Sequence, residues 1–281
     1  MSRTIKFRGA PLTLVGRNLK IGSPAPDFRV IATDLKDIWL GGFKSKIKVI
    51  TFFPSLDTPV CDGQVKEFNI RAAGLSSDVT VLGISKDLPF AQKRFCSTFD
   101  INTITLFSDY RYSSFGINYG VLIKELNLLA RGVFILDKND ILRHVQITEE
   151  LTSPLDYGAA ITALEELIKN PSSIAESQLP SKCKPCEIGS PPLPKERIEQ
   201  LLLQAKGWEL VDDKKIVKEF KFKDFTEAKY FLDLVSVIAE GQGHHPTLTL
   251  TYNKLKVTLT THAAGGLTDN DFIMAGIIDE L

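Results

Sequence analysis

An apolar run that stops at a proline and is followed by a cysteine constrains the first half of the chain most strongly. Residues 47–53 are rich in β-branched and aromatic side chains, which predicts a buried strand. Pro54 ends it, because proline cannot donate to a ladder. Residues 63–69 then carry Val65 and Phe68, a spacing that predicts an opening helix. Cys61 is therefore expected where the end of a strand meets the start of a helix.

This position favours a reactive thiol at Cys61. Free amide donors and the positive end of a helix dipole stabilise a thiolate. The hydroxyl of Thr58, three residues earlier, can bond the sulfur if the loop turns back. The alternative is that Cys61 is a small buried apolar residue, as most free cysteines are. The coincidence of strand end, prolines, hydroxyl and helix start favours the reactive thiol.

The segment Pro54-Ser55-Leu56-Asp57-Thr58-Pro59-Val60-Cys61 has the form Pro-x-x-x-Thr-x-x-Cys and resembles the active-site signature of peroxiredoxins. More narrowly, it resembles that of bacterial thiol peroxidases of the atypical two-cysteine type. The Pro-rich segment 22–28 extends the resemblance toward the N-terminus. The resemblance implies that Cys61 attacks the O–O bond of hydrogen peroxide or an organic hydroperoxide and becomes a sulfenic acid.

Two further residues are implied by the same resemblance. Cys96, in Lys93-Arg94-Phe95-Cys96, would condense with the oxidised Cys61 to an intramolecular disulfide, which thioredoxin would reduce by exchange. Arg131, in 128–134, would stabilise the departing oxygen. From the residues alone, Cys96 could equally pack in the core of an amphipathic helix, and Arg131 could be a solvated residue at a strand end.

The cysteines also carry a geometric expectation. A disulfide requires Cα atoms about 5.5 Å apart. Cysteines on two separate packed helices usually lie farther apart, so we expect local unwinding around Cys61 and Cys96 during turnover.

The order of elements in the first half predicts a thioredoxin-like α/β fold, in which strands and helices alternate before a closing hairpin and helix. We expect a short hairpin within residues 1–22 and an irregular region at 110–125. The remaining expected elements are strands 47–53, 78–85 and 103–107, a helix after Cys61, helices 89–96 and 157–169, and a hairpin of 131–136 with 141–145.

A polar break divides the chain, and we place a thiol-peroxidase-like domain at 1–169, a linker at 170–181 and a second domain at 182–281. The second domain is predicted to be α+β, one antiparallel sheet with helices on one face. Its expected elements are helices 194–205 and 224–240, strands 207–210, 215–220, 247–252 and 255–260, and a last helix from 268 or 269.

A group of histidines marks the second domain. His244 and His245 lie between a helix end and a strand, and His262 follows the paired strand. With Glu240 and Asp271 they suit general acid–base chemistry or a metal site. The alternative is a pair of loop histidines with one turned inward for packing.

Several segments of the second domain together resemble the pterin-4a-carbinolamine dehydratases. They are Gly207-Trp208, Glu240-x-x-x-His244-His245-Pro246, Tyr252-Asn253-Lys254, Thr260-Thr261-His262 and Asp271. The resemblance implies loss of water from a 4a-hydroxytetrahydropterin to give the quinonoid dihydropterin. The three histidines would surround the pterin, with His245 and His262 moving protons.

The same resemblance assigns supporting roles in this site. Glu240 and Asp271 would orient imidazoles, and Trp208 and Pro246 would line or orient the site. It implies no metal and no cofactor.

Cys183-Lys184-Pro185-Cys186 is a single CxxC. A zinc site usually needs four ligands, and a thioredoxin-type motif would follow a strand, so neither fits. Similar segments precede bacterial dehydratase domains, and inheritance with that domain is the favoured interpretation. A labile disulfide that exchanges with Cys96 is the alternative.

The bulk composition adds a few expectations. Thirty-four Lys and Arg balance thirty-four Asp and Glu, which gives no general attraction to nucleic acid or membrane. The sequence predicts neither a signal peptide nor a spanning segment, and we expect a cytoplasmic homo-oligomer. The competing function is a peroxide sensor with a C-terminal protein-binding dimerisation module.

Overall fold

The structure, a computed structural model, describes residues 3–44, 46–72, 74–170, 183–184 and 191–281. The chain divides into two compact units, Met1–Gln178 and Leu179–Leu281. Apart from residue 170, the expected linker at 170–181 lies outside the described residues, as does Cys186. No helix in the described ranges is long and apolar enough to cross a bilayer.

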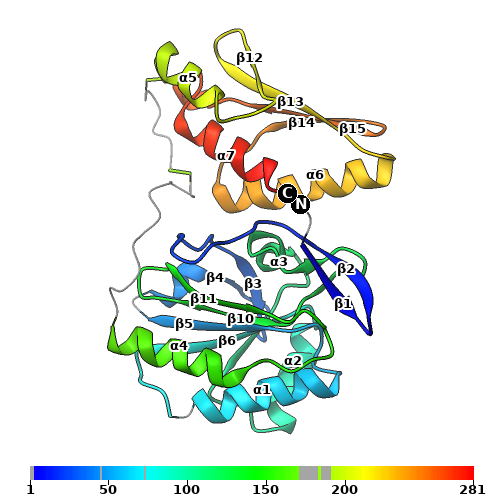
Figure 1. Cartoon of the computed structure of the whole chain (residues 1–281), viewed down its shortest axis with the longest axis vertical. Helices are drawn as coiled ribbons and strands as arrows, with labels where there is room; N and C mark the ends of the chain where they lie inside the picture. Colours follow the sequence, from blue (N-terminus) through cyan, green and yellow to red (C-terminus); the bar gives the residue numbers. More distant parts are fainter. Residues whose placement is uncertain (1–2, 45, 73, 171–182, 185–190) are drawn as a thin grey trace. The chain divides into compact units, whose positions relative to one another are not determined.

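A seven-stranded sheet in the order β11-β10-β5-β6-β7-β3-β4 forms the centre of the N-terminal unit (Figure 1). The pairs β5–β6 and β6–β7 are parallel, and the other pairs are antiparallel. The strands are β3 Arg29–Ala32, β4 Asp37–Trp39, β5 Ile47–Phe52, β6 Val79–Ser85, β7 Thr105–Ser108, β10 Gly132–Leu136 and β11 Leu142–Ile147.

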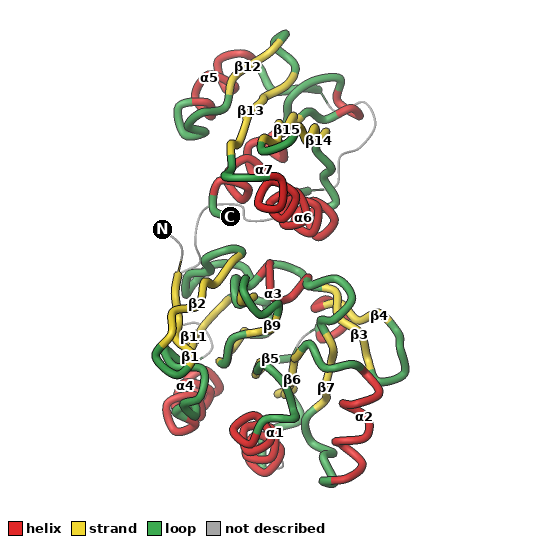
Figure 2. Tube along the Cα trace, turned by 90° about the vertical axis from the view of Figure 1, so that its right-hand side faces the viewer, coloured by secondary structure: helices red, strands yellow, loops and turns green. Residues whose placement is uncertain are grey.

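Every residue of β5 is buried, Lys48 and Thr51 included, as its largely apolar pattern predicts for a strand covered on both faces. The helices α1 Pro59–Ala72, α2 Pro89–Thr98 and α4 Tyr157–Lys169 lie on one face of the sheet, and α3 Ser114–Asn118 lies on the other (Figures 1 and 2). The thioredoxin-like arrangement expected from the sequence is confirmed. The strands β3 and β4 were not predicted, because runs of only four and three residues are too short to show a clear period.

Residues 110–125, expected to be irregular, contain α3 and the strand β8 Leu122–Ile123. This expectation was wrong because a five-residue helix is too short for apolar periodicity to show. The side chain of Asp109 binds the first turn of that helix: its carboxylate accepts the amide hydrogens of Phe115 and Gly116 at 3.0 and 2.9 Å. Burial raises the pKa of Asp109 to about 7.

A second, four-stranded sheet of the N-terminal unit runs β1-β2-β8-β9. Its strands β1 Arg3–Phe7 and β2 Ala10–Val15 form the expected N-terminal hairpin, with Phe7 opposite Ala10. The strand β9 is Leu128–Leu129 and pairs with β8. A short 3₁₀ helix, Leu40–Phe43, follows β4.

The C-terminal unit has one antiparallel sheet in the order β12-β13-β15-β14. Its strands are β12 Glu209–Val211, β13 Lys215–Lys221, β14 Thr247–Thr251 and β15 Lys254–Leu259. Its helices are α5 Lys195–Leu202, α6 Phe225–Gln242 and α7 Asp269–Asp279. Both α6 and α7 pack on the same face of the sheet, as expected (Figures 1 and 2).

The ends of these helices are chemically defined. The side chain of Asp224 accepts the amide hydrogen of Glu227 at 3.0 Å and caps α6. Gly243 ends α6 with φ at 62°, a conformation that favours glycine. Thr268 and Asp271 form a capping box at the start of α7.

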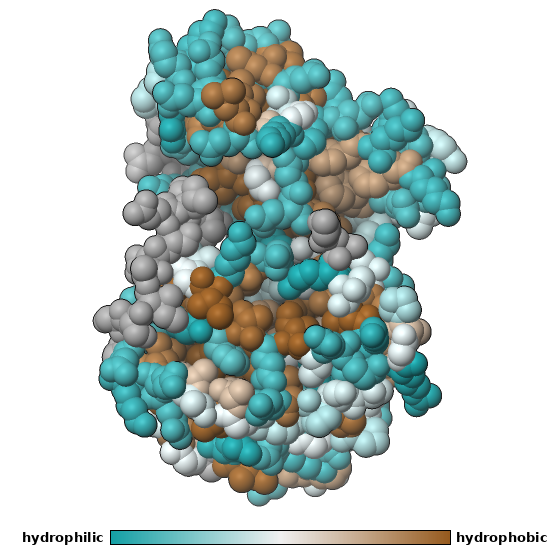
Figure 3. Space-filling model, viewed as in Figure 1, coloured by the Kyte–Doolittle hydropathy of each residue, from teal (hydrophilic) through white to brown (hydrophobic). Residues whose placement is uncertain are grey.

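On the face that Figure 3 shows, both units mix hydrophilic and apolar side chains, with apolar patches between polar ones. On α2 and just before it, Leu88 and Phe90 expose 52% and 63% of their surface. The start of the helix that carries Cys96 therefore exposes two large apolar side chains to solvent.

Candidate active sites

The sulfur of Cys61 lies at the start of α1 and receives two hydrogen bonds. The Thr58 hydroxyl donates to Sγ at 2.7 Å, and Nη2 of Arg131 donates at 3.2 Å. Cys61 itself has no exposed surface. Both donors stabilise negative charge on the sulfur, as the expected position at a helix N-terminus also does. The structure therefore brings together Cys61, Thr58 and Arg131.

Arg131 is held in a fixed orientation. Its Nη1 donates to Oε1 of Gln64 at 2.6 Å, and its Nε donates to the carbonyl of Leu151 at 3.1 Å. Only 2% of its surface is exposed, and no carboxylate in the described part of the chain forms an ion pair with it. A buried cation requires a compensating charge. The Cys61 sulfur is the partner in contact that can supply it.

Sequence reasoning did not single out Gln64. This residue is fully buried on α1, and its Nε2 donates to Thr51 Oγ1 at 2.6 Å and to the Phe52 carbonyl at 3.2 Å. It thereby connects Arg131 to strand β5. The available signal was a glutamine three residues after Cys61, on the turn of helix that faces the sheet.

Asp87 fixes the loop that precedes Cys61. Its carboxylate accepts hydrogen bonds from the Ser55 hydroxyl at 2.6 Å and from the Leu56 amide at 2.8 Å. The Ser85 hydroxyl donates to the same group at 2.8 Å. Asp87 lies two residues before α2. One side chain therefore connects the loop of Cys61 to the start of the helix that carries Cys96.

Cys96 lies on α2, half-buried, and packs against an apolar cluster that includes Cys61. Burial raises the pKa of the Cys96 thiol. The thiol is therefore protonated at neutral pH, which suits a second thiol better than the attacking one. As expected, the two cysteines are carried by different helices.

A second centre lies where α6 ends and α7 begins. Nε2 of His244 and Oδ1 of Asp271 are 2.8 Å apart, and both residues are buried. The other carboxylate oxygen of Asp271 accepts the Thr261 hydroxyl and the Thr268 amide, each at 2.8 Å. Asp271 thus connects His244 to the turn that carries His262. An orienting carboxylate of this kind fixes an imidazole ring.

The other two histidines are exposed. Nε2 of His245 lies 3.1 Å from Oε2 of Glu240, and both side chains face solvent. His262 begins a 3₁₀ helix, His262–Ala264, directly after Thr261. Pro246 is partly buried between His245 and β14.

Trp208 lies elsewhere in the C-terminal unit. Its indole Nε1 donates to Oδ2 of Asp279 at 3.1 Å. Asp279 ends α7, eight residues beyond Asp271, which is roughly 12 Å along a helix. The structure therefore does not bring Trp208 together with the His244–Asp271 pair, because its indole is bound at the opposite end of the helix.

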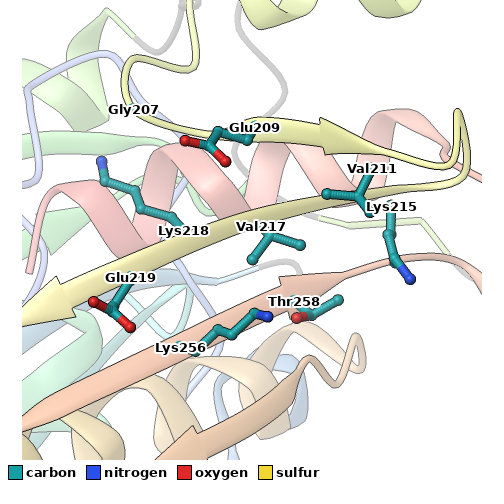
Figure 4. A pocket seen from close by; sticks show the side chains of 9 residues that line it. All are labelled: Gly207, Glu209, Val211, Lys215, Val217, Lys218, Glu219, Lys256 and Thr258. Carbon is teal, nitrogen blue, oxygen red and sulfur yellow. The ribbon is translucent and has the colours of Figure 1, made fainter.

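A groove of about 400 Å³ opens on the sheet of the same unit (Figure 4). Its lining includes Lys256 and Thr258 of β15, which alternate with the buried Leu255, Val257 and Leu259. Because strand side chains alternate between faces, these lining residues point away from α6 and α7. No histidine lines this groove, which is separate from the His244 centre.

The two units match two known families. Residues 20–161 match the Redoxin family, and residues 191–281 match the pterin 4 alpha carbinolamine dehydratase family. A thiol peroxidase of Halalkalibacterium halodurans is 47% identical over 160 residues, which cover 57% of this chain and 96% of that protein.

Two solved structures are similar to parts of the chain. A peroxiredoxin-like protein from Aquifex aeolicus is 44% identical with a TM-score of 0.56, covering 59% of this chain and 98% of its own. A transcriptional coactivator/pterin dehydratase from Brucella melitensis is 36% identical with a TM-score of 0.31, covering 31% of this chain and 95% of its own. The chain therefore belongs to the thiol peroxidases of the Redoxin family and continues into a pterin-4a-carbinolamine dehydratase domain, so that one polypeptide combines a peroxidase with a dehydratase.

Proposed function

We propose that Cys61 is the peroxidatic residue and that Cys96 resolves it. The Cys61 thiolate attacks one oxygen of ROOH, the O–O bond breaks, and the other oxygen leaves as ROH after taking a proton. The resulting sulfenic acid condenses with the Cys96 thiol, which releases water and forms the disulfide. Thioredoxin returns both thiols by exchange and leaves oxidised. The supporting observation is the buried sulfur with two donors and an Arg131 that has no carboxylate partner in the described residues.

In this scheme Arg131 and Thr58 stabilise the negative charge that moves during the reaction. Negative charge begins on the sulfur and moves to the departing oxygen as the O–O bond breaks. Donors that already point at the sulfur stabilise that shift without reorganisation. Gln64 and the Leu151 carbonyl keep the guanidinium in place while it occurs.

Arg131→Met should lower kcat/KM for hydrogen peroxide by roughly 100-fold or more, because loss of one preorganised donor typically costs that much. Thr58→Val should have a smaller effect in the same direction, and Thr58→Ser, which keeps the hydroxyl, should remain close to the parent chain. Peroxide consumption and the rate of Cys61 alkylation by iodoacetamide at pH 7 measure these effects. An unchanged alkylation rate in Arg131→Met would show that the guanidinium does not activate the sulfur.

Cys96→Ser should allow one turnover per chain and then stop, because the sulfenic acid has no partner to condense with. Mass spectrometry after trapping with dimedone should find the adduct on Cys61 and not in the parent chain. Ser97→Ala, one residue along α2, is the matched control and should recycle normally. Full steady-state turnover of Cys96→Ser with thioredoxin would assign resolution to another thiol. Poor turnover of the parent chain itself would favour the peroxide sensor.

If the loop before Cys61 and helix α2 both unwind so that the two cysteines can form a disulfide, the hydrogen bonds of Asp87 must break. Asp87→Asn replaces one acceptor oxygen by a donor and weakens the bonds from Ser55 and Leu56. Disulfide formation should therefore be several-fold faster, and the fraction of Cys61 lost to sulfinic acid at high peroxide should fall. Quenched-flow alkylation with mass spectrometry measures both. Asp34→Asn, which alters an exposed ion pair of the same unit, is the control. Slower disulfide formation would contradict the proposed unwinding.

In the dehydratase unit, we propose that His245 and His262 move protons while His244, oriented by Asp271, binds the pterin. The C4a–O bond breaks, the hydroxyl takes a proton and leaves as water, and loss of the N5 proton completes the C=N bond. Glu240 orients His245 through its 3.1 Å contact. The supporting observation is the His244–Asp271 pair, which is connected through Thr261 to His262.

His245→Ala and His262→Ala should each lower kcat for carbinolamine dehydration by roughly 100-fold, the usual contribution of one general acid or base. The loss of the carbinolamine absorbance measures this rate. His144→Ala, on β11 of the other unit, is the control and should dehydrate normally. Normal rates in both site variants would contradict the proton-transfer role of these histidines, whereas the absence of dehydration by the parent chain would favour a binding or dimerisation module.

A further inference from the structure

The described half of the CxxC segment is bound to the C-terminal unit. Cys183 is 6% exposed, and its amide donates to Oε1 of Gln242 at 2.8 Å. Its Sγ lies 3.7 Å from the carbonyl oxygen of Asn270, within the range of a weak thiol hydrogen bond. This segment lies far earlier in the chain than both of its partners.

Lys184 and Asn270 form a reciprocal pair. The Lys184 amide donates to Oδ1 of Asn270 at 2.9 Å, and Nδ2 of Asn270 donates to the Lys184 carbonyl at 2.7 Å. The asparagine side chain therefore contacts the backbone of the segment much as a neighbouring strand would. Asn270 is 5% exposed, so water competes little for these bonds.

The two side chains that bind this segment each adjoin the dehydratase site. Gln242 is the last residue of α6, and only Gly243 separates it from His244. Asn270 directly precedes Asp271 in the first turn of α7. We use the name 183–184 clamp for the backbone of Cys183 and Lys184 together with the side chains of Gln242 and Asn270. The clamp spans the same two helix ends that the His244–Asp271 contact joins.

We infer that the 183–184 clamp positions the His244–Asp271 pair for dehydration, an inference that rests on the proposed role of His244. Gly243 has a positive φ and no Cβ, so the chain between α6 and His244 has no side chain to limit its rotation. The His244 amide bond to the Ala239 carbonyl and the clamp restrict it instead. A displacement of about 1 Å in a reacting group can cost 100-fold in rate. The clamp thus gives Cys183 and Lys184 a role that needs neither metal nor redox chemistry.

Asn270→Ala in the full chain removes both bonds to Lys184 and should lower kcat for dehydration 10- to 100-fold while KM changes less than threefold. Gln242→Met removes the acceptor for Cys183 and should act in the same direction, whereas Gln242→Glu keeps that acceptor and should restore most of the rate. Ser236→Ala is the control. It removes a side-chain bond to a backbone carbonyl, that of Leu232 at 2.8 Å, in the same unit and outside the dehydratase motif. It should leave kcat unchanged.

A spectroscopic readout separates positioning from loss of stability. In the ¹⁵N-histidine-labelled chain, the ring proton between His244 and Asp271 should exchange slowly and give its own resonance, assigned by its loss in His244→Gln. The resonance should broaden or vanish in Asn270→Ala and persist in Ser236→Ala. Persistence in Asn270→Ala would overturn the inference, even if kcat and melting temperature both fell. Full dehydratase activity in His244→Gln would instead refute the proposed role of His244, and the resonance would still test the clamp.

Discussion

The buried charge of Arg131 is the constraint on which the peroxidase unit depends. Because only 2% of its surface is exposed, the guanidinium needs hydrogen-bond acceptors for its N–H groups and a compensating negative charge within the protein. Gln64 and Leu151 satisfy two of its nitrogens, and the sulfur of Cys61 faces a third. A thiolate at Cys61 would balance the buried charge of Arg131, and under the proposed role the guanidinium would in turn activate the sulfur.

In the dehydratase unit a buried carboxylate, and not a buried cation, holds a side chain of the candidate site. Its buried carboxylate, Asp271, caps its own helix and at the same time holds His244. Asp271, in the first turn of α7, thus also contacts His244, so folding of the helix and placement of the imidazole are coupled. In both units a helix terminus supplies the reference point, the first turn of α1 for Cys61 and the first turn of α7 for His244.

Much of this organisation could be predicted from the sequence because it is local. The strand β5, the prolines and Cys61 are consecutive, and their order alone places the sulfur at the start of α1. Contacts between distant segments carry no such pattern. Nothing near Asp87 indicates that its carboxylate binds the loop at residues 55–56, some thirty residues earlier.

The same limit applies to the C-terminal unit. The bonds from Asn270 to Lys184 join positions 86 apart in the chain and could not be read from either segment. Trp208 shows the opposite case: a resemblance placed it in the histidine site, but its indole is satisfied by Asp279 at the far end of α7. The position of a buried tryptophan depends on where its indole N–H finds an acceptor, and a sequence motif does not specify that acceptor.

The absence of exposed surface on Cys61 has a consequence for the order of events in a catalytic cycle. A peroxide of a few atoms needs only a small opening to reach the sulfur, whereas a protein partner needs several hundred Å² of contact. The conformation in the structure therefore leaves a protein thiol without access to this atom. Under the proposed cycle, reduction by a protein thiol requires a second conformation in which the sulfur is exposed.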